Sequence, residues 1–244
     1  MNTLQRLQNP LLYVLVFFSG FANLATEIIG PRLFSSMFGT TTSVWAIMIS
    51  VTLVGLAVGY ALGGRISLNN IRTMLPAILL ANAVWLMLVS WLVWEVPASA
   101  VSGGAAPDTS LILTTALSAF FVPSVLFGML SPISITLLGE HRPPEAVSQI
   151  VGNIYAISTV GSVAGALAAA FYLIPWVGLS ASLRIFAVGL TLFAVYFWYI
   201  TRDGRQGLPI TPALVMGFVL IFPQPDFQWE TDDNLTLLAQ REGY

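Results

Sequence analysis

Residues 43–64 read SVWAIMISVTLVGLAVGYALGG and contain no charged side chain. As a helix this stretch would measure about 33 Å, close to the roughly 30 Å hydrocarbon core of a bilayer. Its glycines stand four residues apart, a spacing common where membrane helices pack together. The stretch therefore predicts a membrane-spanning helix, and most of the remaining chain has the same character.

The composition of the whole chain points to a membrane protein. The 244 residues are 57% hydrophobic and 8% charged, with a mean hydropathy of +0.84, whereas soluble domains are about 25% charged. So few charges cannot cover a globular surface, and lipid must solvate much of the chain. We predict an all-α fold, a polytopic helical membrane bundle with six or seven transmembrane helices, seven being slightly preferred.

The first predicted span runs from Leu11 to Ile29 and stops at Gly30-Pro31, a pair that breaks helices. It is long enough to be retained as a helix instead of being cleaved as a signal peptide. The other predicted spans occupy 43–64, 74–96, 109–138, 150–177, 180–200 and 208–222. The span at 109–138 is long for one crossing and is expected to kink or to lie partly on the surface. The last span, at about 22 Å, is short for a crossing.

The domain division and the orientation follow from these spans. We expect a transmembrane domain over 1–222 and a polar, acidic tail over 223–244. Arginines in short loops favour the cytoplasmic side, and a cytoplasmic N-terminus puts most of them there: Arg6, Arg65, Arg72, Arg142, Arg202 and Arg205, against Arg32 and Arg184 outside. We expect an integral protein of a bacterial-type inner membrane. The side of the tail stays open, because six and seven crossings put it on opposite sides.

Several classes of function are excluded by what the chain lacks. It has no lysine, and its nine arginines are scattered, so we expect no nucleic-acid partner. It has no cysteine and one histidine, His141, so we expect no metal site. No catalytic pattern and no cofactor motif is present in these residues. The expected partners are the lipid bilayer and, as an open alternative, other membrane subunits.

Glycines at four-residue spacing mark two predicted helices. Gly55, Gly59 and Gly63 lie on one face of the second span, and Gly161 and Gly165 repeat the spacing in the fifth. Having no side chain, they let another helix approach closely, so we interpret them as packing residues. The alternative is a sliding surface of the kind found in transporters. Because spans one to three and four to six each carry such a helix in the middle, an inverted repeat is a further hypothesis.

A few polar residues fall inside the predicted spans. Glu27 is the single acid well inside one, and intramembrane acids are generally functional. A chain reversal at Gly30-Pro31 would let Glu27 pair with Arg32, and the alternative is a site for a cation or a proton. Asn153, like Asn23 and Asn82, is expected to hydrogen-bond a neighbouring helix, with contact to a substrate as the alternative.

Five stretches of the chain resemble, in order, the membrane-bound spermidine synthase-like proteins, also known as fused major-facilitator/spermidine synthase proteins. Residues 19–39, with Glu27 followed by Arg32-Leu33, resemble that family's first helix. The others are GLAVGYALGGR at 55–65, GMLSP at 128–132, the helix 153–165, and IPWVGL at 174–179. Ser131 stands where the family has Phe, and Ser158 where it has Asn. These departures put in doubt any role that is tied to those two positions.

The resemblance implies a function outside the bundle. The family's chains continue into a Rossmann-type spermidine synthase-like domain that binds decarboxylated S-adenosylmethionine and a polyamine, and residues 237–244 resemble its first strand and turn. We therefore expect a membrane module that anchors or serves a soluble transferase half absent from these residues. The chain would be an aminopropyltransferase-like enzyme only if it continues past Tyr244. Two alternatives stay open: an accessory subunit of a membrane complex, and a transporter-like protein for small cations such as polyamines.

Overall fold

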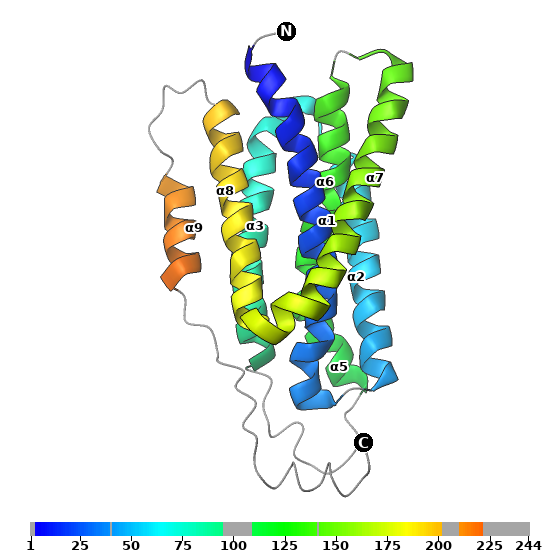
Figure 1. Ribbon diagram of the computed structural model, residues 1–244, viewed down its shortest axis with the longest axis vertical. Helices are drawn as coiled ribbons and strands as arrows, with labels where there is room; N and C mark the ends of the chain where they lie inside the picture. Colours follow the sequence, from blue (N-terminus) through cyan, green and yellow to red (C-terminus); the bar gives the residue numbers. More distant parts are fainter. Residues whose placement is uncertain (1–2, 40, 95–108, 141, 202–209, 222–244) are drawn as a thin grey trace, which may run out of the picture.

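The computed structural model describes residues 3–39, 41–94, 109–140, 142–201 and 210–221, and these residues form helices joined by short turns (Figure 1). The predicted all-α class is confirmed for this part of the chain. The predicted tail, 223–244, lies outside the described residues. The α-helices are α1 (Thr3–Phe38), α2 (Thr42–Gly63), α3 (Leu68–Trp94), α5 (Thr109–Ala116), α6 (Val122–Gly139), α7 (Pro144–Ala168), α8 (Leu179–Thr201) and α9 (Ile210–Ile221).

Two π-helical segments extend α-helices without a break. Segment η1 (Leu117–Phe121) joins α5 to α6, and η2 (Ala169–Val177) continues α7. The predicted span at 109–138 is thus one continuous helix over 109–139, and the expected surface-lying half is wrong. A π turn frees a backbone carbonyl from its usual partner, and here the Trp85 indole N–H donates to the carbonyl of Ala119 at 3.2 Å.

Five helical stretches are long and apolar enough to cross a membrane: 10–35, 42–63, 109–139, 144–177 and 179–200. Helix α3 adds a shorter apolar stretch at 73–89. The predicted end of the first span at Gly30-Pro31 is wrong, because α1 runs on to Phe38. Ending a helix inside a bilayer would leave several carbonyls without donors, whereas Pro31 removes only one hydrogen bond.

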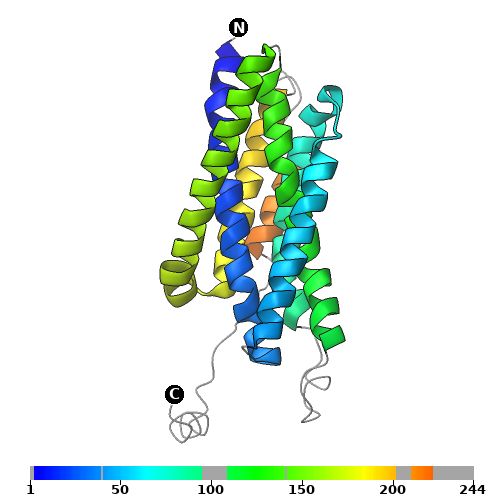
Figure 2. The same cartoon turned by 90° about the vertical axis from the view of Figure 1, so that its right-hand side faces the viewer.

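The helices pack mainly in three pairs, α1 with α7, α2 with α6, and α3 with α8 (Figures 1 and 2). Helices α1 and α6 also contact each other, which joins the first two pairs. An aromatic contact lies beside this junction: the ring centroid of Phe34 in α1 is 5.9 Å from that of Phe120 in η1, the segment that leads into α6. The outer faces of α2 and α7 carry exposed apolar side chains, such as Leu53 and Leu167, as expected of surfaces that face lipid.

Candidate functional site

The contact between α2 and α6 is made through glycines. A Cβ atom added to Gly59 would fall within 3.0 Å of the Val125 carbonyl oxygen, and one added to Gly63 would lie 2.7 Å from that of Met129. From the opposite side, Gly128 faces the carbonyl oxygen of Leu56, which its Cβ would meet at 2.7 Å. The two backbones are therefore too close for any side chain at these positions.

The contact between α1 and α7 has the same construction. Cβ atoms added to Gly161 and Gly165 would collide with the carbonyl oxygens of Phe17 and Phe21, and one added to Gly20 with that of Ser158. Across this contact the Ser162 hydroxyl donates a hydrogen bond to the Gly20 carbonyl at 3.3 Å. Together with Gly55, which packs on Ser124, all five glycines singled out in the sequence thus lie at helix-helix contacts.

The two contacts match residue by residue. The contact of Gly59 with Val125 corresponds to that of Gly161 with Phe17. Adding 102 to a residue number in α2 gives its counterpart in α7, so Gly59 becomes Gly161. Adding 108 to a number in α1 gives its counterpart in α6, so Phe17 becomes Val125. The same two shifts relate the other contacts: Gly63 on Met129 to Gly165 on Phe21, and Gly128 on Leu56 to Gly20 on Ser158. A duplicated unit accounts for this constant register.

Hydroxyl groups follow the same correspondence. Thr26 in α1 donates to the Ala22 carbonyl at 2.6 Å, and its counterpart Ser134 in α6 donates to the carbonyl of Leu130 at 2.7 Å. Under this register Pro31 in α1 and Pro132 in α6 are not counterparts, because their numbers differ by 101 and not by 108. The repeat is therefore carried by the glycines and hydroxyls of the packed faces.

The two units run in opposite directions. Helix α1 starts at the end of the bundle where the N-terminus lies, whereas its counterpart α6 finishes there (Figure 1). Likewise α2 runs toward that end and α7 away from it. Units of three helices in inverted orientation are a common construction of secondary transporters, whose substrate sites lie near the bilayer midplane at the interface of the repeats.

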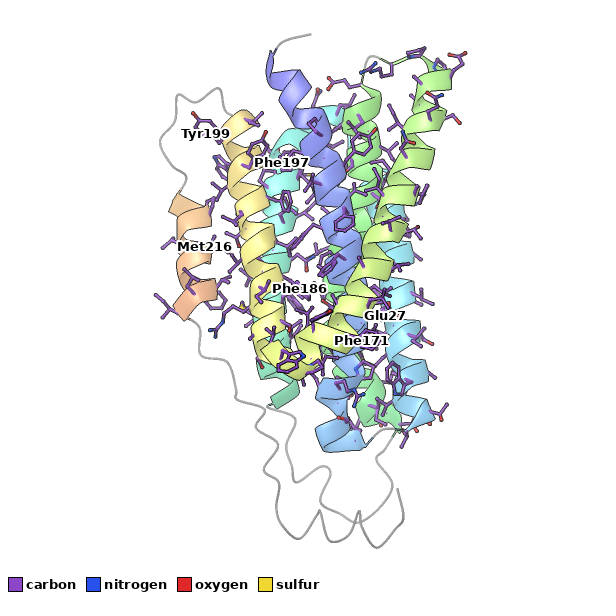
Figure 3. All side chains as sticks on the ribbon, in the orientation of Figure 1. Glu27, Phe171, Phe186, Phe197, Tyr199 and Met216 are labelled. Atoms are coloured by element: carbon purple, nitrogen blue, oxygen red, sulfur yellow. The ribbon has the colours of Figure 1, made fainter. Side chains whose placement is uncertain are left out.

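Glu27 lies near the middle of the bundle, on the side of α1 that meets α2. Its carboxyl is within hydrogen-bonding reach of the Thr52 side chain, and Thr52 stands halfway along α2, a helix of about 33 Å. Figure 3 shows Glu27 in the part of the bundle between α7 and α2. A charged carboxylate at the centre of a membrane helix costs about 2.5–3.5 kcal/mol on insertion scales, so a lone acid at this depth calls for a function.

The expected pair of Glu27 with Arg32 is not formed. Because α1 continues past Pro31, the chain does not reverse, and five residues along a helix put the two side chains on different faces. Arg32 is exposed, and the described residues contain no ion pair between the two. Pro31 also has no N–H for the carbonyl of Glu27, so the helix is locally weakened at this acid.

The three asparagines differ in their surroundings. Asn153 is exposed on α7, and Asn23 is half-buried, so neither matches the expected buried amide. Asn82 in α3 is fully buried, and within the described residues neither its amide nitrogen nor its oxygen has a hydrogen-bond partner. An unsatisfied buried amide destabilises a fold.

Replacing Asn82 with leucine, which has the same branching at Cγ, is therefore expected to stabilise the protein. Removing a buried polar group without a partner relieves about 1–3 kcal/mol. The measurement is the unfolding temperature of the purified chain in one detergent, beside wild type. A lower unfolding temperature in the variant would mean that the amide is satisfied, and would contradict the expectation.

Sequence reasoning missed Thr52. Its hydroxyl bonds the Met48 and Ile49 carbonyls at 2.9 and 3.0 Å, as threonines in membrane helices commonly do, and nothing in the sequence distinguishes it from the others. Among the described residues no group of three or more His, Cys, Asp and Glu side chains could hold a metal ion.

Comparison with protein-family models, with curated proteins and with solved structures returned no match.

Proposed function

We propose that the chain is the membrane-embedded module of a spermidine synthase-like, aminopropyltransferase-like protein, and that it anchors or serves a soluble transferase half. The main support comes from where the motif stretches of the resemblance meet. The glycines of 55–65 pack on the stretch around 128–132, and 153–165 meets the first motif, 19–39, where Gly165 packs on Phe21 and Gly20 packs on Ser158. Four of the five stretches thus form the two glycine contacts, so the motif series describes one packed unit.

The proposal includes six or seven crossings and a cytoplasmic N-terminus in a bacterial-type inner membrane. Helix α3 has 27 residues and packs along α8, which suits a sixth crossing. Helix α9 has 12 residues, about 18 Å, so a seventh crossing would need a thinned bilayer or residues outside the described range. The turn from α2 to α3 and the end of α6 lie at the N-terminal end of the bundle (Figure 1), with Arg65 and Arg142 exposed there, in keeping with arginine-rich cytoplasmic loops.

The intact mass of the native protein, extracted from membranes, tests this proposal. A mass well above 26.3 kDa, together with aminopropyl transfer by the purified full chain, is the expected result. A native mass near 26.3 kDa, with no transferase copurifying in mild detergent, would contradict it.

A further inference from the structure

The two glycine contacts divide four helices into two tightly packed pairs. Within the α1/α7 pair and within the α2/α6 pair the backbones touch directly, so each pair is expected to move as one body. Between the pairs, three contacts involve side chains: Met48 on Gly30, Phe34 on Phe120 in the segment η1 that leads into α6, and Glu27 on Thr52. Glu27 and Thr52 therefore bridge the boundary between two bodies, halfway along α2.

The charge at this boundary is not balanced by the described residues. Glu27 forms no ion pair with them, and the side chain that reaches its carboxyl is the neutral Thr52. Arg65 and Arg142 are exposed in the turns at the N-terminal end of the bundle, and Arg32 is exposed near the far end of α1. A single carboxylate held in apolar surroundings favours one monovalent cation.

We propose that this boundary binds one small protonated amine, whose N–H groups donate to the Glu27 carboxylate and to the Thr52 hydroxyl oxygen. An ammonium group has three donors and no acceptor, so two or three nearby oxygens satisfy it. Metal cations with oxygen ligands take about six or more, and no cluster of acids stands at this place in the described chain.

The site lies between the two helix pairs, so a bound amine would link their positions. In inverted-repeat carriers the substrate lies at the midplane between two bodies, and their rocking opens the site to one side of the membrane and then to the other. Glu27 belongs to one pair and Thr52 to the other, so a bound amine would contact both bodies at once. The site stands apart from the transferase proposal, since it needs no residue outside the bundle.

Calorimetric titration of the full chain in lipid nanodiscs with n-butylammonium chloride tests this site. We expect one bound equivalent in wild type, and binding at least about tenfold weaker in Glu27→Gln, which loses the charge-assisted bonds. Thr52→Val, of similar shape, should bind several-fold more weakly. The matched control is Glu145→Gln, at an exposed acid in the first turn of α7, which should bind as wild type does. Tetramethylammonium, which has the charge but no N–H, should bind much more weakly than butylammonium.

Two results would overturn the site: no butylammonium binding in folded wild type, or equal binding by Glu27→Gln. Equal affinity for tetramethylammonium would refute the hydrogen-bonding part and with it the amine class. If Glu27→Gln does not fold, as judged by its elution profile and unfolding temperature, the Thr52→Val and tetramethylammonium titrations decide. A native mass near 26.3 kDa would contradict the transferase proposal and leave these titrations unaffected, so the two failures are distinguishable.

Discussion

Replacing Gly161 with alanine is expected to destabilise the bundle by about 1–3 kcal/mol, the usual cost of overpacking. The added methyl group would collide with the backbone carbonyl of Phe17, and a backbone group cannot move aside as the end of a flexible side chain can. Helices α1 and α7 would have to separate along their length. The measurement is the thermal unfolding temperature of the purified variant in detergent.

Gly152→Ala is the matched control for this change. Gly152 is on the same helix, is exposed, and has no atom within 4 Å of an added Cβ. Because alanine favours a helix over glycine by about 1 kcal/mol, this variant should be at least as stable as wild type. Equal stability of the Gly161 and Gly152 variants would show that α1 and α7 do not pack in this way.

The same substitution at Gly59 should destabilise by a similar amount, again about 1–3 kcal/mol. Its added methyl group would collide with the Val125 carbonyl and would lie 2.9 Å from the Cα of Gly128. The two positions are counterparts in the repeat, and their contacts are separate, so the losses in a Gly59/Gly161 double variant should add. The unfolding temperatures of the two single variants and the double variant measure this.

Gly217→Ala in α9, where an added Cβ meets nothing within 4 Å, is the control for the second contact. If Gly161→Ala lowered the unfolding temperature and Gly59→Ala did not, the two units would not be equivalent.

The sequence predicted helix bounds best where an uncharged apolar run has clear polar ends. The span expected at 43–64 is found at Thr42–Gly63, with the Thr41 hydroxyl accepting from the Val44 N–H at 3.3 Å as the cap. The prediction that the first helix ends at Gly30-Pro31 was wrong because Gly30 has a packing role. Met48 and Phe120 lie where its side chain would be, so the glycine makes room for neighbours instead of ending the helix.

The partners of the packing residues could not be read from the sequence. The spacing of Gly59 and Gly63 shows that one face of α2 admits a close neighbour, but several helices could supply it. That α6 does so, with Val125 opposite Gly59, depends on long-range packing. For the same reason Glu27 could be identified as unusual, while its neighbour Thr52 could not be found.

Two helix units, α1 with α2 and α6 with α7, run in opposite directions, and the sidedness of two equivalent turns tests most directly whether they are inverted across a membrane. Thr41 precedes the second helix of the first unit, and Glu145 lies at the start of the second helix of the other; both are exposed. The chain has no cysteine, so single cysteines at these positions can be labelled without background. In intact cells a membrane-impermeant maleimide should label Thr41→Cys, and should label Glu145→Cys only after the membrane is opened. Labelling of both from the same side would contradict the inversion.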